Sequence, residues 1–373
     1  MARPEIPTHS GKVHSVSTSA IDLLPNVSVL LIAGSESGGR AYGNDSALDA
    51  VGTVHWLDSS PTISSEAFEA EFDRLLPDVD IILVSAWNRR VPPFTAERYA
   101  RASRLRIIAG TFDNRFGDWI DVQEAAGHNI TVIDTSRTMT PTVAEFALAM
   151  TLTIMRDIPA AIQLVREGGW QTAHWDQPGF VSGDLTGRKI GLAGFGVINR
   201  RYAELIAPFH CERRTYDPFV DDEVLQAAGV ERAASLEDLA AGSDIFVIGI
   251  PPTPQTQHII NAAVIDALPR GSTLILVTRM AVVEQEPLWR RTRAGEIRAA
   301  IDVFDPEPPP ADAWFRTSPY VYPTPHIAGN TRDCHRRCFT IACDEALDAL
   351  AGKPVRYAAT PHDDMIYRGT PRA

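Results

Sequence analysis

The sequence predicts an α/β protein built from two doubly wound parallel sheets. Short apolar runs alternate with helical stretches early in the chain, and a similar series begins again after a long apolar helix. The chain has 373 residues, a length that suits two domains better than one. Apolar residues make up 45% of it and charged residues 22%, which is ordinary for a globular protein.

The first series contains four expected strands and a helix. The helix is SEAFEAEFDRLL at 65–76, which is amphipathic. The strands are VSVLLIAG at 27–34, IILVSA at 81–86, LRIIAG at 105–110 and ITVIDT at 130–135. Continuous apolar runs of this length indicate strands that are buried on both faces, as in a parallel sheet.

The longest apolar helix is expected in TPTVAEFALAMTLTIMRDI, residues 140–158. It is apolar nearly all round, and such a helix is buried between domains or between subunits. We therefore expect a homodimer that pairs through the helix starting near Thr142, since an isologous pair is the commonest assembly. We expect no apolar run to approach the length of a membrane span, and therefore no membrane partner.

The second series repeats the pattern of the first. A final helix at about 331–351 is expected to pack back on the first domain. The expected elements between them are the strand KIGLA, the helix VINRRYAELIAPF, the strand RRTYD, and strands at 244–250, 272–278 and 297–303.

Charge and cysteine content exclude several classes of function. The formal net charge is −12 and no long basic run occurs, so we expect no nucleic-acid partner. The N-terminus lacks an apolar signal core, so a cytoplasmic protein is expected. Cys334, Cys338 and Cys343 lie close together, but their spacing matches no zinc motif and the segment reads as a helix. We therefore expect no metal site.

The segment GLAGFGVINR, residues 191–200, predicts a dinucleotide site. Gly194 and Gly196 follow an expected strand, and Val197 and Ile198 open the next helix, whose N-terminus would face the pyrophosphate. Asp217 ends the following strand, where an acidic residue binds the ribose hydroxyls and disfavours a 2′-phosphate.

Asn199 stands where this fingerprint has its third glycine. That glycine serves helix–strand packing, so we expect Asn199 to strain the packing without blocking the cofactor.

Five stretches together resemble the D-isomer-specific 2-hydroxyacid dehydrogenases. They are TVAEFALAMTLTIMRDI, GRKIGLAGFGVINRR with its later YDP, PPTPQTQHIIN, ILVTRMAVVEQEPLWRRTRAGEIRAAIDVFDPEP and PTPHIAGNT. The resemblance implies two Rossmann-like domains, with the cofactor domain inserted into a flavodoxin-like substrate domain. Residues 139–325 would bind NAD, residues 1–138 and 326–373 would form the substrate domain, and the active site would lie in the cleft between them.

The resemblance also implies site residues. The catalytic arginine, acid and histidine of the family fall on Arg279, Glu307 and His326. The aspartate that meets the nicotinamide carboxamide falls on Asp302. Other positions implied to line the cofactor are Ile250, Pro251, Thr256, Val277, Thr278, Ala328 and Gly329.

The chemistry of a 2-oxo acid favours these residue types independently. A guanidinium such as that of Arg279 can bind the carboxylate and polarise the neighbouring carbonyl. A protonated imidazole such as His326 can give a proton to the oxygen that gains charge as hydride arrives. A carboxylate such as Glu307 on the other ring nitrogen fixes the tautomer and favours the protonated ring.

Two departures from the family lie near the expected substrate. Met280 follows the arginine where the family has glycine, and Trp87 with Ala86 stands where backbone amides hold the substrate carboxylate. We expect Met280 and Trp87 to form an apolar wall that favours 2-oxo acids with apolar or aromatic side chains. The alternative is that Met280 points into the core and only packs.

These observations predict an NAD-dependent oxidoreductase that transfers a hydride between nicotinamide and a 2-oxo or 2-hydroxy acid, with D-isomer specificity implied by the resemblance. Two alternatives stay open. One is oxidation of formate or phosphite on the same fold, and the other is a non-catalytic protein that senses NAD(H).

Overall fold

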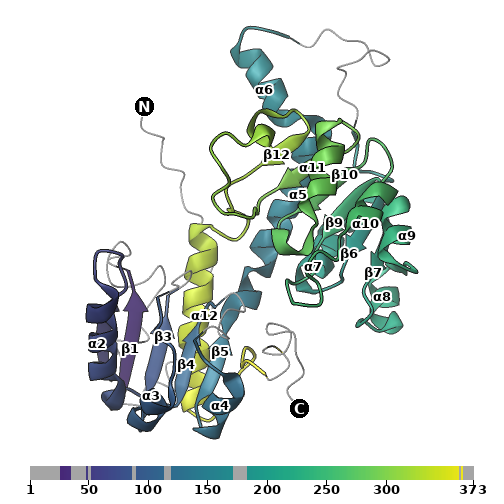
Figure 1. The fold of residues 1–373 in the computed structure, drawn as a ribbon. Coiled ribbons are helices and arrows are strands. Elements are labelled where there is room, and N and C mark those ends of the chain that lie inside the picture. The colour runs from purple at the N-terminus through teal and green to yellow at the C-terminus, as the bar shows by residue number, and fades with distance from the viewer. Residues whose placement is uncertain are drawn as a thin grey trace.

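The computed structural model contains two parallel β-sheets, each covered by helices on both faces (Figure 1). It describes residues 26–34, 48, 52–85, 90–112, 119–170, 183–360 and 363. The predicted fold class, α/β with two Rossmann-like units, is confirmed. The domain boundaries at 139 and 326 stay predictions.

The first sheet has five strands in the order β2-β1-β3-β4-β5, all parallel. Four of them, β1, β3, β4 and β5, coincide with the apolar runs expected to be strands, and their residues are almost entirely buried. The strands are β1 (Val27–Ala33), β2 (Gly52–Asp58), β3 (Ile81–Val84), β4 (Ile107–Gly110) and β5 (Thr131–Asp134).

The edge strand β2 was not predicted from the sequence. In GTVHWLD only Leu57 is buried, because the strand pairs on one side only, with β1. An edge strand therefore lacks the continuous apolar run that identifies the inner strands.

The second sheet has seven strands in the order β12-β11-β10-β9-β6-β7-β8, again all parallel. The chain turns to opposite sides of β6 in building β7 and β9, and a crevice opens at such a reversal. The strands are β6 (Lys189–Ala193), β7 (Glu212–Tyr216), β8 (Glu231–Arg232), β9 (Ile245–Ile248), β10 (Thr273–Leu276), β11 (Arg298–Ile301) and β12 (Val321–Pro323).

Each sheet buries two apolar clusters, one on either face. The first sheet carries α2 (Ser65–Leu75), α3 (Ala96–Arg101) and α4 (Val122–Gly127) on one face. The long C-terminal helix α12 (Arg332–Leu350) packs on the other face, as the sequence predicts (Figure 1). Around the second sheet lie α7 (Val197–Ile206), α8 (Asp222–Ala228), α9 (Leu236–Ala241), α10 (Ala262–Ala267) and α11 (Gln285–Arg293).

The apolar helix predicted at 140–158 is α5 (Thr140–Arg156), which connects the two sheets. Its buried side chains pack against α7 and the second sheet within the same chain. With the preceding turn it forms a 22-residue segment that is long and apolar enough to cross a membrane, which the sequence analysis did not expect. Half of an apolar 18-residue stretch within this segment is buried in the fold. Burial of this kind accounts for its apolar character as an interior helix.

Candidate active site

The candidate catalytic and cofactor residues converge at one edge of the second sheet. Each follows the carboxyl end of a strand: Gly194 follows β6, Asp217 follows β7, Arg279 follows β10, and His326 follows β12. In parallel α/β sheets, ligands bind outside this edge, at the crevice where the strand order reverses.

His326 and Glu307 form a hydrogen-bonded pair. The Nδ1 atom of His326 lies 2.8 Å from Oε2 of Glu307, and both side chains are only partly exposed. The other carboxylate oxygen, Oε1, accepts the backbone N–H of Phe304 at 2.8 Å. The carboxylate is therefore held on both sides and presents a fixed oxygen to the imidazole.

The charge of Arg279 reaches the same pair. Burial by itself acts to raise the pKa of the Glu307 carboxyl. The hydrogen bonds from Phe304 N–H and His326, together with the charge of Arg279, outweigh this and hold the pKa of Glu307 below its usual range. The guanidinium also donates from Nη1 to the carbonyl of Thr278 at 2.7 Å. The structure thus brings together the three residues that the sequence suggests for catalysis.

Asp302 anchors the loop that carries His326. Its side chain is fully buried, and its Oδ1 accepts from the Thr324 hydroxyl at 2.6 Å and from Ile327 N–H at 2.9 Å. Its Oδ2 accepts from Ala328 N–H at 2.8 Å, and its carbonyl accepts from His326 N–H. Burial raises the pKa of Asp302 despite these bonds. The sequence did not indicate this positioning role of Asp302. A contact of Asp302 with the nicotinamide stays a prediction.

The predicted glycine turn has the backbone that a dinucleotide site requires. Gly194 adopts φ 79°, which a residue with a side chain rarely adopts, and its N–H donates to the carbonyl of Tyr216. Gly196 is the N-cap of α7, a Cβ there would enter open space, and no side chain of the described residues caps the helix. The first-turn N–H groups of Val197 and Ile198 therefore lack a side-chain cap at the end where an anion binds best.

Asp217 is positioned beside this turn. Its Oδ2 accepts Phe195 N–H at 2.7 Å and its Oδ1 accepts Phe219 N–H at 2.9 Å. Each oxygen keeps a second lone pair with which it can accept a ribose hydroxyl.

The sequence did not indicate that Arg232 lies near Asp217, because Arg232 belongs to the edge strand β8. Arg232 donates from Nη1 to the carbonyl of Asp217 at 2.6 Å and from Nε to the Asp222 carboxylate at 2.6 Å, and it also bonds the carbonyl of Val220. These bonds turn three of its N–H groups toward the loop.

The other implied cofactor positions line the same edge. The Thr278 hydroxyl donates to the carbonyl of Ile248 at 3.1 Å, and the Thr256 hydroxyl donates to the carbonyl of Pro251 at 2.6 Å. Pro251 is exposed and Thr256 partly so, whereas Ile250, Val277, Thr278, Ala328 and Gly329 are buried.

The prediction that Met280 forms part of an apolar wall beside the substrate is wrong. Its side chain is only 2% exposed and belongs to the buried cluster on one face of the second sheet. The short helical turn Met280–Val282 after Arg279 directs it into that cluster. Ala86 and Trp87, the other predicted substrate residues, lie outside the described residues.

The donor set fits NAD at this edge. The turn at Gly194 and Gly196 offers backbone N–H groups to a diphosphate, and the open space beside Gly196 admits its close approach. Asp217 offers acceptors for a ribose.

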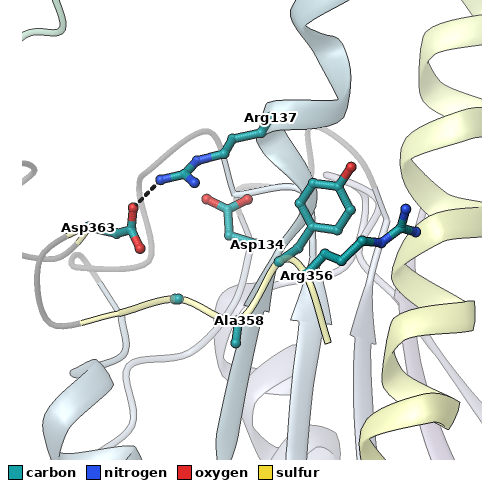
Figure 2. Close-up of a pocket in the computed structure, with 7 residues that line it drawn as sticks. Asp134, Arg137, Arg356, Ala358 and Asp363 are labelled. Atoms are coloured by element: carbon teal, nitrogen blue, oxygen red, sulfur yellow. Dashed lines mark hydrogen bonds and ion pairs between the residues drawn. The ribbon is translucent and has the colours of Figure 1, made fainter. Parts of the chain in front are cut away.

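Two other features carry no comparable chemistry. Cys334, Cys338 and Cys343 are buried in α12, and the described part of the chain contains no cluster of His, Cys, Asp or Glu suited to a metal. A small cavity beside β5, bordered by Asp134, Arg137 and Asp363, has a volume of about 20 Å³ (Figure 2). That is roughly the room of a single water molecule.

Comparisons with known proteins support an NAD-binding domain in this chain. Residues 148–328 match the model of the D-isomer specific 2-hydroxyacid dehydrogenase NAD binding domain. A hydroxypyruvate reductase of Thermotoga maritima is 30% identical over 282 residues, which cover 74% of this chain and 86% of that protein.

Two further relatives extend the comparison. A D-3-phosphoglycerate dehydrogenase of Methanocaldococcus jannaschii is 27% identical over 74% of this chain, which spans only 51% of that protein. The apo structure of Rhodotorula graminis D-mandelate dehydrogenase has the same fold, with a TM-score of 0.73 at 22% identity, covering 90% of this chain and 98% of that one. The chain therefore belongs to the D-isomer specific 2-hydroxyacid dehydrogenase family and carries its NAD-binding domain.

Proposed function

We propose that this protein is an NAD-dependent oxidoreductase that interconverts a 2-oxo acid and the corresponding D-2-hydroxy acid. The observation that carries the proposal is the 2.8 Å pair of His326 with Glu307, placed where the charge of Arg279 also acts. An acid–base pair beside a cation suits a substrate with a carboxylate next to a carbonyl.

Each residue has a distinct task in this proposal. Bound NADH supplies the hydride that reduces the substrate carbonyl carbon. Arg279 binds the substrate carboxylate and stabilises the charge that develops on the carbonyl oxygen. His326 holds its Nδ1 toward Glu307, so its other nitrogen, Nε2, delivers the proton to that oxygen. Glu307 fixes the ring and favours its protonated form.

We also infer a homodimer, whose contact lies on the helix after α5 and not on α5 itself. The helix α6 (Ile158–Arg166) has no buried residue, and Figure 1 shows it extending away from the second sheet. Ile158, Ile162 and Val165 lie on one side of it and are 40%, 46% and 56% exposed. A second copy of the chain would cover this face, as isologous pairing buries the same patch on both subunits.

The proposal is tested by following the loss of NADH absorbance with a panel of 2-oxo acids of increasing side-chain size. Turnover of at least one acid, with only the D-hydroxy acid oxidised in reverse, is the expected result. Reduction of NAD by formate or phosphite alone would replace the proposed substrate class. Tight NADH binding with no turnover of any panel member would instead support a non-catalytic NAD(H) sensor.

A further inference from the structure

Asn199 lies in the first turn of α7, directly behind the glycine turn. Its side chain is fully buried, and its Nδ2 donates to the carbonyl of Gly194 at 2.7 Å. The same amide lies 3.3 Å from the carbonyl of Ala193 and 3.4 Å from that of Val247. The side chain thus fastens the helix to the turn and to two neighbouring strands.

Gly249, just after β9, makes room for this side chain. A Cβ at position 249 would lie 2.5 Å from both Cγ and Nδ2 of Asn199, closer than real side chains approach. Gly249 is itself fixed, because its N–H donates to the carbonyl of Ala193 at 2.8 Å. The packing strain that the sequence suggests at Asn199 is therefore relieved, because the close approach is made possible by a glycine just after β9 in place of a glycine in α7.

Packing alone does not account for the asparagine. Its Oδ1 is buried and has no hydrogen-bond partner among the described residues. An unpaired buried acceptor is costly, and a small apolar residue would avoid that cost. What the amide adds is the short hydrogen bond to the carbonyl of Gly194, the residue whose positive φ shapes the turn.

We propose that Asn199 is a positioning residue for the diphosphate of the cofactor, with Gly249 as its structural complement. By holding the Gly194 carbonyl, Asn199 fixes the peptide plane between Gly194 and Phe195, and so the direction of the N–H groups that follow it. Restoring the usual third glycine at this position would then weaken cofactor binding. The inference rests on the proposed binding of NAD at this turn.

A double-mutant cycle with ligand-binding measurements tests the proposal. The variants are Asn199→Gly, Gly249→Ala and the double variant, with Arg201→Ala on the exposed side of the same helix as the matched control. NADH affinity is measured by its fluorescence on binding. ADP-ribose, which carries the diphosphate, and adenosine, which lacks it, are then compared as competitors. Thermal unfolding without ligand reports on packing separately.

We expect each single variant to weaken NADH and ADP-ribose binding by about threefold to tenfold, as for the loss of one hydrogen bond. Adenosine binding should stay unchanged. The double variant should bind no worse than the weaker single variant, since both changes remove the same bond. It should nevertheless unfold at a higher temperature than Gly249→Ala, because the clash is gone.

Three results would overturn the inference. One is an Asn199→Gly protein that binds NADH and ADP-ribose as tightly as the wild type. Another is a double variant that recovers full affinity, which would show that packing alone matters. The third is unchanged ADP-ribose binding in Gly249→Ala. This variant reports on the same hydrogen bond and serves as the test if Asn199→Gly does not fold. A wild-type protein that does not bind NADH would overturn the proposed function as well.

Discussion

Glu307 lies between His326 and the charge of Arg279 in the candidate site. Its Oε2 pairs with His326, and its Oε1 accepts the N–H of Phe304. The charge of Arg279 helps to lower the pKa of Glu307. Because its pKa lies below the usual range, the carboxyl stays ionised from mildly acidic pH upward. Its charge is therefore present throughout the range in which His326 must be protonated to act.

Glu307→Gln should shift the pH dependence of 2-oxo acid reduction toward acid. The substitution removes the negative charge that favours a protonated His326, so the loss of rate with rising pH begins at a lower pH. The measurement is kcat/KM against pH for the wild type, for Glu307→Gln and for Asp305→Asn, which removes an equal charge from the same loop. An unchanged profile for Glu307→Gln would contradict the role assigned to Glu307.

Met280→Gly should destabilise the fold without changing substrate preference. The side chain is buried in the core of the second domain, where truncation costs about 2–5 kcal/mol. Met280→Leu, which keeps the volume, should cost less than about 1.5 kcal/mol. The ratio of kcat/KM between bulky and small 2-oxo acids should stay flat, and a change of roughly tenfold would show that Met280 reaches the substrate after all.

Asp217→Ala should narrow the preference for NADH over NADPH. In the proposed site the Asp217 carboxylate, held beside the glycine turn by Phe195 N–H, would repel a 2′-phosphate because like charges repel. Arg232 lies nearby, but its hydrogen bonds turn it toward the loop carbonyls and Asp222. The measurement is the ratio of kcat/KM with NADH to that with NADPH, in the wild type and in Asp217→Ala. A wild-type protein that prefers NADPH would contradict the role assigned to Asp217.

At the scale of elements, α5 and α6 differ in what covers their apolar residues. The apolar face of α5 is used within the chain, against α7 and the second sheet. The exposed apolar side belongs to α6, which begins where Asp157 takes a left-handed conformation and ends α5. The helix predicted at 140–158 ends at the first residue of α6, so the prediction did not include the helix whose apolar side is exposed.

Val165→Asp should dissociate the proposed homodimer while leaving the monomer folded. The residue is exposed on α6, so a charge there costs little in a monomer and much inside an apolar interface. Gln163→Asp, on another side of the same helix, is the matched control. Sedimentation velocity at micromolar concentration should show a monomer only for Val165→Asp. A wild type that sediments as a monomer would refute the dimer.

At the scale of the whole molecule, the inner strands and the order of motifs could be predicted from the sequence. Apolar runs identify β1, β3 and β6 because buried strands of parallel sheets need them. The edge strand β2 could not be found this way, since one of its sides is open.

The candidate site was also predictable from the sequence only in part. Motif positions located Arg279, Glu307 and His326, which the fold brings to one sheet edge. The roles of Asp302 and Gly249 could not be predicted, because each depends on contacts across distant parts of the chain.

The central claim is that the pair of His326 and Glu307 performs the chemistry while other residues hold the cofactor. It is tested most directly by measuring kcat and NADH affinity for His326→Ala on the best acid of the panel. The account predicts that kcat falls by about 10²–10⁴-fold, as for a positioned acid–base group, while the NADH dissociation constant barely changes. Full activity in His326→Ala, or an equal loss of NADH binding and turnover, would contradict it.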